Sequence, residues 1–169
     1  KLISNGHEVT IICGSYTVGN TGLEGKFKNG YRTGNVDGIN VIEFDLKYTS
    51  NFNLFQRLLS FFRFAIKSIN IAIKYDYDIV YATSTPLSVG IPGIIAKHFK
   101  KKPFIFEVRD LWPDLPKAMG IIQNKFFLKI LYFLEWITYK SADHIIALSP
   151  GMAKGINKKG ISNSKITMI

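Results

Sequence analysis

Short apolar runs, rich in β-branched residues, alternate along the chain with longer segments of helical periodicity, and this alternation constrains the fold most. Apolar runs of five or six residues that are separated by helices form parallel strands buried on both faces. The sequence therefore predicts an α/β fold, a Rossmann-like doubly wound parallel sheet. The predicted strands span 8–13, 39–44, 78–82, 103–108, 143–148 and 165–169.

Helices are predicted between these strands. Residues 52–75 carry apolar side chains at helical spacing and predict an amphipathic helix about 36 Å long. Pro86 suits the first turn of a second helix. Asn124 can cap a third helix, which is expected to end at Ser141, and Ser149 precedes a fourth helix. Gly6 marks the end of a short helical segment. The core stripe expected of the first helix is Phe55, Leu58, Leu59, Phe62, Ile66, Ile69 and Ile73.

Residues 14–38 contain seven of the fourteen glycines and little hydrophobic pattern, so they predict a long loop or loose hairpin. The glycine spacing matches neither a dinucleotide fingerprint nor a P-loop, because no Gly-Lys-Ser/Thr is present and no strand and helix flank it correctly. The expected organisation is one Rossmann-like domain over residues 1–169 with this glycine-rich loop at 14–38.

Composition narrows the protein class. A chain of 169 residues that is 47% hydrophobic suits one folded domain, and the single Cys13 excludes an internal disulfide framework and a cysteine-built zinc site. The longest charge-free run, 79–96, has 18 residues but contains Pro86 and Pro92. Strand, turn and buried helix therefore describe it better than a membrane span. The net charge of +10 indicates attraction to polyanions, without choosing among nucleic acid, lipid head groups and phosphorylated molecules.

The positive charge concentrates in the middle of the chain: residues 1–46 carry −1, 47–102 carry +7 and 103–169 carry +4. The middle third holds the 52–75 helix, in which aromatic residues outside the expected core stripe alternate with cations. Such a helix can lie on an anionic bilayer. The alternative is that another layer of the parent protein or the long loop covers these residues. The candidate membrane contacts are Arg57, Phe61, Arg63, Phe64 and Lys67.

Ligands of open parallel sheets collect at the carboxyl ends of the strands, so the polar residues that follow each strand are the candidate site. The segment 107–114 is the most unusual of these. Arg109 can bind phosphate or sugar hydroxyls, and Asp110 can orient it or accept from a hydroxyl. The alternative is a structural ion pair of Arg109 with Asp110 or Glu107, with Trp112 as a core plug. Candidate substrate-binding residues are Ser15, Thr83, Ser84, Thr85, Trp112, Ser149 and Gly151.

Four segments in order, 5–12, 78–82, 106–113 with Gly120, and 141–149, resemble the N-terminal domain of GT-B fold retaining glycosyltransferases of family four. The Arg-Asp-Leu-Trp-Pro sequence that begins at Arg109 is similar to the branch that builds O-antigen and capsule, such as N-acetyl-L-fucosaminyl transferases. The resemblance covers nearly the whole chain.

This resemblance implies a hexosyltransferase-type enzyme that takes part in bacterial polysaccharide biosynthesis. In the family, this domain mainly binds the acceptor, and a second Rossmann-like domain binds the nucleotide-sugar donor. The resemblance implies a lipid-diphosphate-linked sugar as acceptor, no cofactor, and a cytoplasmic protein peripheral at the inner face of the cell membrane. Family members also have a strand before the region of Lys1 and a second domain after Ile169, so these residues alone are expected to be inactive.

Many relatives have a His-Asp pair where this chain has Arg109 and Asp110. An arginine cannot serve as a base near neutral pH, so Arg109 is expected to stabilise charge on a diphosphate or bind a hydroxyl. Retaining transfer in the family requires no protein nucleophile, and none is evident. The three histidines, His7, His98 and His144, are scattered and predict no metal site.

Two other protein classes agree with parts of the sequence. A nucleic-acid-binding module agrees with the charge, but the sequence lacks an RNP-like aromatic strand, a helix-turn-helix signal and a KH-type loop. A non-enzymatic flavodoxin-like or response-regulator-like module would show an acidic cluster at the first strands or a phosphate-binding loop. Neither is visible in the sequence.

Overall fold

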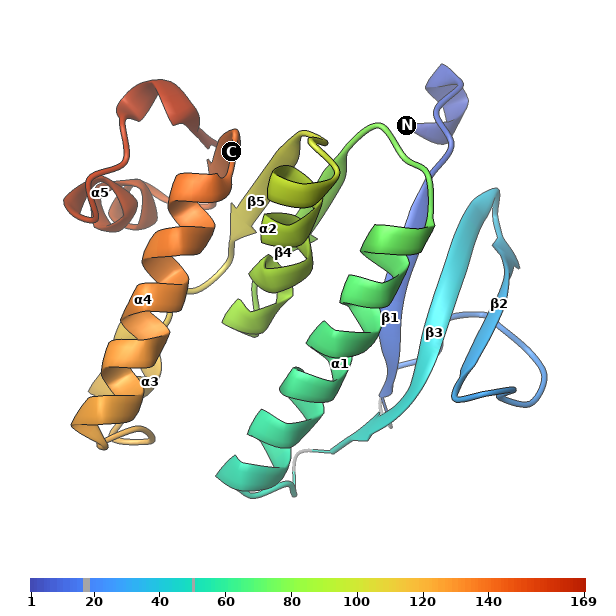
Figure 1. The fold of residues 1–169 in the computed structure, drawn as a ribbon, viewed down its shortest axis with the longest axis horizontal. Helices are drawn as coiled ribbons and strands as arrows, with labels where there is room; N and C mark the ends of the chain where they lie inside the picture. Colours follow the sequence, from blue (N-terminus) through green and yellow to red (C-terminus); the bar gives the residue numbers. More distant parts are fainter. Residues whose placement is uncertain (17–18, 50) are drawn as a thin grey trace. The chain divides into compact units, whose positions relative to one another are not determined.

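The computed structural model describes residues 1–16, 19–49 and 51–169, which form two compact units, Lys1–Lys67 and Ser68–Ile169 (Figure 1). The described strands form two sheets, one of three strands and one of four. The four-stranded sheet is parallel throughout, and helices connect its strands. This α/β architecture confirms the predicted Rossmann-like fold class. That residues 1–169 form a single domain stays a prediction.

The first unit contains a sheet in the order β1-β3-β2, formed by β1 (Thr10–Tyr16), β2 (Tyr31–Val36) and β3 (Ile39–Tyr48). Strand β3 is parallel to β1 and antiparallel to β2. The β2–β3 hairpin turns at Asp37 and Gly38, both with positive φ, as the favoured two-residue turn requires. A short 3-10 helix, Ile3–Asn5, ends at Gly6 in the left-handed conformation, as predicted.

Strand β2 lies inside the region predicted as a loop or loose hairpin, and residue 14 already belongs to β1. The hairpin is therefore well formed on its β2–β3 side, and the loop prediction for these strand residues is wrong. Most side chains of β2 are exposed, so the strand has no apolar alternation that a sequence pattern could reveal. A side-chain contact also links β2 to β3: Arg32 Nε on β2 donates to the buried carboxylate of Glu43 on β3 at 3.0 Å.

Helix α1 (Leu54–Lys74) confirms the long helix predicted over 52–75. It begins with a reciprocal cap, in which Gln56 N donates to Asn53 Oδ1 at 2.9 Å and Asn53 N donates to Gln56 Oε1 at 3.0 Å. The expected core stripe is wrong in part, because four of its residues are exposed: Phe55, Phe62, Ile66 and Ile73.

The second unit contains the four-stranded sheet in the order β4-β5-β6-β7. Its strands are β4 (Val80–Thr83), β5 (Phe104–Val108), β6 (His144–Ala147) and β7 (Ile166–Met168). The connecting helices are the 3-10 turn Leu87–Val89, α2 (Gly90–Phe99), α3 (Asp114–Ala118), α4 (Lys125–Ser141), α5 (Pro150–Lys158) and the 3-10 turn Asn163–Lys165.

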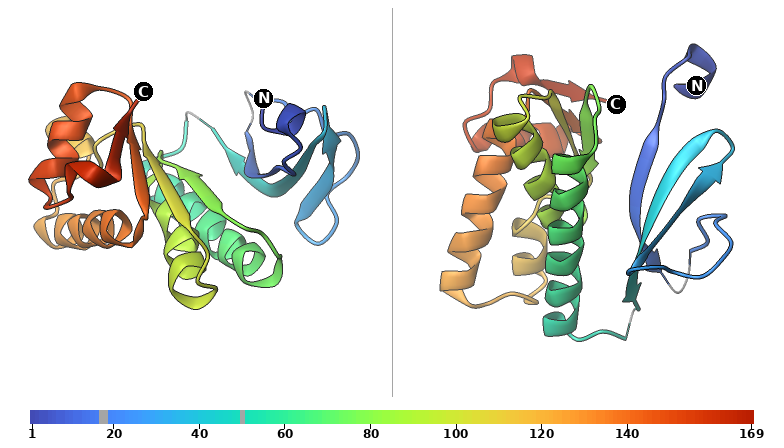
Figure 2. Two further views of the ribbon diagram at one scale, coloured as in Figure 1. Left: turned by 90° about the horizontal axis from the view of Figure 1, so that it is seen from above. Right: turned by 45° about the vertical axis from the view of Figure 1, so that its right-hand side comes forward.

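Helices α2 and α4 lie side by side against one face of this sheet (Figures 1 and 2). Phe104, Phe106 and Val108 of β5 alternate toward that face and are fully buried beside Tyr139 of α4. The predicted caps are confirmed: Asn124 accepts from Phe127 N, and Ser149 accepts from Met152 N. Within the described ranges, no helix combines the length and apolar content needed to cross a bilayer.

Candidate active site

Two loops at the carboxyl end of the parallel sheet are joined by the buried side chain of Ser84, which is 2% exposed. Ser84 directly follows β4, and its backbone N donates to Glu107 O on β5 at 2.9 Å. Its Oγ accepts from the backbone N of Arg109 at 2.9 Å. Ser84 therefore fixes the backbone at which the chain leaves β5, and with it the origin of the Arg109 side chain.

A second link joins the same loops at the surface. Thr85 Oγ1 donates to Asp110 Oδ2 at 2.7 Å. This hydrogen bond orients the Asp110 carboxylate, while its other oxygen, Oδ1, is not used in the bond. Sequence reasoning named Ser84, Thr85, Arg109 and Asp110 separately, and the structure brings all four together.

The ion-pair partner of Arg109 is Glu107 rather than Asp110. Arg109 Nε lies 3.9 Å from Glu107 Oε1, and the arginine side chain is 61% exposed. A pair at this distance, with one exposed member, contributes little to stability. Most donors of the guanidinium therefore remain available to a ligand. Of the two structural pairings considered for Arg109, the geometry supports the one with Glu107.

Tyr81 extends the cluster and was missed by sequence reasoning. Its hydroxyl donates to Glu107 Oε2. Burial, together with this hydrogen bond, raises the pKa of Tyr81 to about 12, so it remains a donor at neutral pH. The available signal was strand alternation: Tyr81 and Thr83 share one face of β4, and Thr83 pairs in register with Glu107.

Trp112 has the geometry of the core-plug alternative. It is partly buried and packs against two apolar clusters, one around Val108 and one around Ile122. Its backbone N donates to Asp110 O at 3.0 Å, which tightens the turn after β5. Trp112 thereby anchors the loop that carries Arg109 and Asp110. A direct sugar contact by Trp112 stays a prediction.

The remaining predicted substrate contacts differ in what they do. Ser149 caps α5 by accepting from Met152 N at 3.2 Å, and Gly151 and Thr83 are exposed. Ser15 lies in the first unit, where its Oγ accepts from Leu46 N at 3.0 Å beside an irregularity in the β1–β3 pairing. Ser15 therefore has a structural partner within its own sheet. Substrate binding by these residues stays a prediction.

The expectation that Phe61 and Phe64 point away from the packed face of α1 is wrong. Phe64 packs edge-on against Phe44 with ring centroids 5.7 Å apart, and Phe61 stacks on Tyr48 at 5.6 Å. Both rings therefore contact β3. Sequence periodicity placed the packed stripe on the neighbouring face of the helix because both faces of α1 are apolar.

The cations of α1 also have local contacts. Arg57 Nε donates to Phe52 O at 2.8 Å, and Lys67 Nζ donates to Gly30 O at 3.3 Å and lies over the Phe44 ring. Arg63 is exposed. Membrane contact by these α1 residues stays a prediction.

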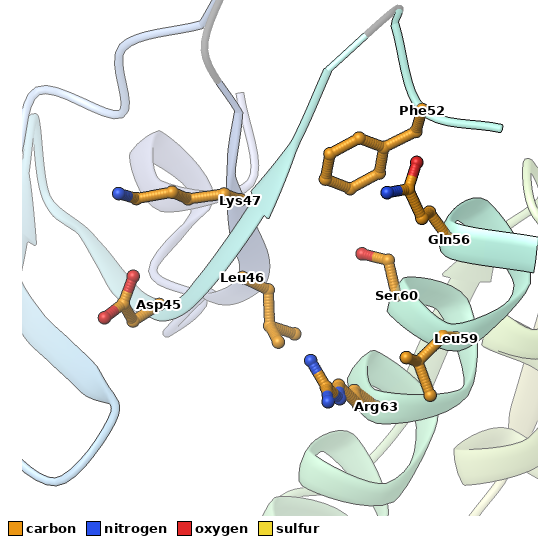
Figure 3. A pocket seen from close by; sticks show the side chains of 8 residues that line it. All are labelled: Asp45, Leu46, Lys47, Phe52, Gln56, Leu59, Ser60 and Arg63. Atoms are coloured by element: carbon orange, nitrogen blue, oxygen red, sulfur yellow. The ribbon is translucent and has the colours of Figure 1, made fainter.

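Arg63 also lines a cavity of about 260 Å³ between β3 and α1 in the first unit (Figure 3). Leu46 points toward the helix, whereas Asp45 and Lys47 point away on the other side of the strand. Gln56, Ser60 and Arg63 line the helical side at a spacing that places them on one face. The cavity therefore has Leu46 directed toward it from the strand and three polar side chains on the helix. The other lining residues are Asp45, Lys47, Phe52 and Leu59.

The second unit also contains a buried carboxylate. Glu135 of α4 is fully buried, and its Oε2 lies 2.8 Å from Lys159 Nζ. Burial raises the pKa of Glu135, although the Lys159 ammonium opposes that shift. Lys159 Nζ also lies 3.4 Å from Asp114 Oδ2, and Tyr132 OH donates to Asp114 Oδ1 at 2.6 Å. This network ties α3, which follows the Arg109 loop, to α4 and to the end of α5.

Within the described ranges, no three His, Cys, Asp or Glu side chains lie together as a metal-binding group. The chemistry available at the strand ends is that of an exposed guanidinium beside an oriented carboxylate. Such a pair can bind phosphate oxygens and hydroxyl groups.

No curated protein matches this chain at a significant level of similarity. The model of one protein family does match, over residues 1–169, and that family is described as Glycosyltransferase Family 4. The match covers every segment that carries the strand-end cluster. The parallel sheet and connecting helices of this chain agree with a Rossmann-like domain of that family. The chain therefore belongs to Glycosyltransferase Family 4.

Proposed function

We propose that this chain is the acceptor-binding part of a retaining glycosyltransferase of cell-surface polysaccharide synthesis. The enzyme transfers a sugar from a nucleotide-sugar to a lipid-diphosphate-linked saccharide. Membership of the family supports a transferase with a nucleotide-sugar donor and an acceptor substrate. The observation that carries the proposal is the pair of hydrogen bonds, Arg109 N to Ser84 and Thr85 to Asp110, that holds both candidate residues at the carboxyl end of the sheet.

Arg109 supplies fixed positive charge in this proposal. Its guanidinium has five donors, cannot give up its proton near neutral pH, and is largely exposed. It therefore stabilises negative charge on a phosphate, and charge that develops on the leaving diphosphate is stabilised more strongly than charge already present in the ground state. This makes Arg109 an electrostatic residue rather than a base.

Asp110 orients the acceptor. Thr85 occupies one carboxylate oxygen, and the other can accept from a sugar hydroxyl. During transfer, the bond between the donor's anomeric carbon and the diphosphate oxygen breaks with its electron pair on the oxygen. The bond between that carbon and the acceptor oxygen forms on the same face. The acceptor proton passes to the leaving diphosphate, so the reaction is balanced without a protein nucleophile.

The test is transfer by the full-length enzyme with Arg109→Ala, Arg109→Lys and Asp110→Asn. We expect Arg109→Ala to lower kcat by about 10²- to 10³-fold, in the range for removal of one charge-stabilising donor. Arg109→Lys retains the charge but loses the fork of donors, so it recovers part of this loss. Asp110→Asn is expected to raise KM for the acceptor more than KM for the donor.

Lys158→Ala is the matched control, because it removes an exposed cation near the end of α5. It should leave kcat and both KM values unchanged. Near-normal turnover of Arg109→Ala, with an unchanged thermal midpoint, would return Arg109 to a structural role. The acceptor class is tested separately with a lipid-diphosphate-linked saccharide and the same saccharide without the diphosphate. Equal kcat/KM values for the two would reject the lipid-diphosphate acceptor.

We also propose a cytoplasmic location, peripheral at the inner face of a bacterial cell membrane, where a lipid-linked acceptor is accessible. The net charge of +10 supports attraction to an anionic surface. Fractionation of cells at low and high salt tests this location. Release of the enzyme from membranes by salt is expected, and recovery entirely in the soluble fraction at low salt would contradict it.

A further inference from the structure

One face of α4 carries large apolar side chains that the core does not use. Phe126 is 73% exposed, Phe133 is 60% exposed and Trp136 is 46% exposed. The Phe133 and Trp136 rings stack with centroids 6.1 Å apart. Exposed Ile130 lies one helical turn from Phe126 and about one turn from Phe133. These four residues, here called the α4 apolar face, form a contiguous strip along the helix.

The opposite side of α4 already packs into the second unit. Leu128, Leu131 and Tyr139 are buried there, together with Thr138. The helix has 17 residues and is therefore about 25 Å long. The helix therefore has two apolar strips, and only one of them packs into the core of the second unit. A partner for the outer strip must therefore accept aromatic and aliphatic side chains together.

The charges beside the α4 apolar face have one sign. Lys125, Lys129 and Lys140 are exposed and lie on the same side of the helix. The one acidic residue of α4, Glu135, is fully buried on the packed side. The outer surface of α4 therefore has three cations and no anion. Lys140 Nζ also donates to Gly160 O at 2.9 Å, which holds its ammonium near the end of the helix.

We infer that the α4 apolar face, with Lys125, Lys129 and Lys140, docks onto an anionic lipid bilayer. Phenylalanine, isoleucine and tryptophan side chains enter the boundary between head groups and acyl chains, and lysines beside them pair with anionic head groups. A second copy of the same face would bring lysines against lysines. Nucleic acid would engage the lysines but leave Phe126 and Ile130 in water. An anionic bilayer matches both the charge and the apolar strip.

This inference rests on the surface of α4 alone and does not depend on the sugar or acceptor that the enzyme uses. It also differs from the sequence-based prediction for α1. In α1, Phe61 and Phe64 contact β3, whereas in α4 the three aromatic residues of the outer strip are exposed. Because α1 also carries exposed phenylalanines, Phe55 and Phe62, the binding experiment must compare substitutions on the two helices.

The experiment is co-sedimentation of the full-length protein with vesicles of phosphatidylglycerol and phosphatidylcholine, and with vesicles of phosphatidylcholine alone. We expect binding to the anionic vesicles to be at least tenfold stronger. Phe126→Ser with Phe133→Ser should weaken that binding by tenfold or more. Lys125→Gln with Lys129→Gln should weaken it by about 25-fold, since each lysine near an anionic surface contributes roughly a fivefold factor.

The matched control is Phe55→Ser with Phe62→Ser on α1, which removes two phenylalanines of similar exposure. This pair should bind anionic vesicles like the wild type. Trp136 reports the location directly: its fluorescence should shift to the blue and be quenched by brominated lipids, and Trp136→Phe should remove both signals. Trp112, the other tryptophan, remains in that variant and gives the background.

Equal binding to both vesicle types, or loss of binding in the α1 pair but not in the α4 pair, would overturn the inference. A change of oligomeric state in the α4 pair without lipid would assign the face to protein association instead and would also overturn it. Thermal midpoints should match that of the wild type, because the substituted side chains are exposed. Transfer to a water-soluble acceptor should be unaffected, which separates this inference from the proposed transferase function.

Discussion

The backbone amide of Arg109 donates to the hydroxyl of the buried Ser84 at 2.9 Å, across two neighbouring parallel strands. This bond ties the loop after β4 to the loop after β5 at the point where the exposed guanidinium begins its path to solvent. The arginine is thus exposed at its side chain and fixed at its backbone. A charge that must meet a phosphate benefits from this arrangement, because less freedom is lost on binding.

Replacing Ser84 with alanine removes the hydroxyl that accepts from the Arg109 amide and leaves that amide without this hydrogen bond. We expect Ser84→Ala to lower the free energy of unfolding by about 1 to 2 kcal/mol, the usual cost of an unsatisfied buried group. Urea unfolding measures this change. Thr83→Ala, one residue earlier and exposed, should change it by less than about 0.5 kcal/mol. Equal effects for the two variants would mean that the Ser84–Arg109 bond does not stabilise the strand ends.

Sequence reasoning predicted the second unit well because its strands are buried and its helix caps are local. Asn124 and Ser149 were identified as caps from neighbouring residues, and both accept the expected backbone amide. Strand β2 was missed because an exposed strand has no core-facing alternation. The packed side of α1 was misplaced because Phe61, Phe64, Phe55 and Phe62 give the helix two apolar sides. Periodicity alone cannot decide which of them meets β3.

The site was predictable as a region but not as a network. The carboxyl ends of parallel strands pointed to Arg109 and Asp110, yet no pattern identified Glu107 rather than Asp110 as the ion-pair partner of Arg109. That pairing depends on which side of β5 each residue faces and on Thr85, 25 residues away in the sequence, occupying Asp110. The buried Glu135–Lys159 contact is equally non-local. Such contacts cannot be predicted without knowing how the strands and helices are aligned with one another.

Gly93 of α2 and Gly151 of α5 should respond oppositely to the same substitution. A Cβ at Gly93 would lie 2.2 Å from the Phe104 ring, whereas at Gly151 its nearest neighbour would be Ser149 Oγ at 3.9 Å. Gly93→Ala therefore forces the helix away from a fully buried ring and should cost about 2 to 3 kcal/mol. Gly151→Ala should leave the thermal midpoint unchanged or slightly raised.

Gly151→Ala also tests the predicted substrate contact. If a ligand approaches the backbone at residue 151, alanine should raise KM while the thermal midpoint is preserved. An unchanged KM would remove Gly151 from the candidate contacts. A stable Gly93→Ala variant would contradict the close packing of α2 on β5.

The Glu135–Lys159 pair should show the asymmetry of a buried ion pair. Lys159→Met leaves a fully buried carboxylate without its cation and should cost about 3 kcal/mol, whereas Glu135→Leu combined with Lys159→Met should recover most of that loss. Chemical unfolding of the two single variants and the double variant measures the coupling. Additive effects of the two changes would show that the residues do not interact.

The same pair has a pH signature. Burial raises the pKa of Glu135, so the folded chain binds that proton more tightly than the unfolded chain does. The contribution of Glu135 to stability is therefore greatest below its unfolded pKa and decreases as pH rises through the raised folded pKa. Lys159→Met should strengthen this decrease, because the opposing ammonium is gone. A pH dependence like that of the wild type would contradict the assigned contact.

Asp143 should behave in the opposite sense. Burial alone would raise its pKa, but hydrogen bonds from Lys97 and from the Phe104 amide lower the pKa below its ordinary value of 3.8. The unfolded chain therefore takes up the proton first as pH falls. The stability that Asp143 contributes is complete above pH 3.8 and is lost as pH falls through the lower folded pKa.

Asp143→Asn should cost about 1 kcal/mol at neutral pH, since the carboxylate is partly exposed, and progressively less below pH 3.8. Thermal melts across this range measure the difference, with Asp76→Asn, a more exposed carboxylate beside Lys102, as the control with the smaller effect. A stability difference between wild type and Asp143→Asn that stays constant with pH would show that the carboxylate's charge does not hold β5 to the start of β6.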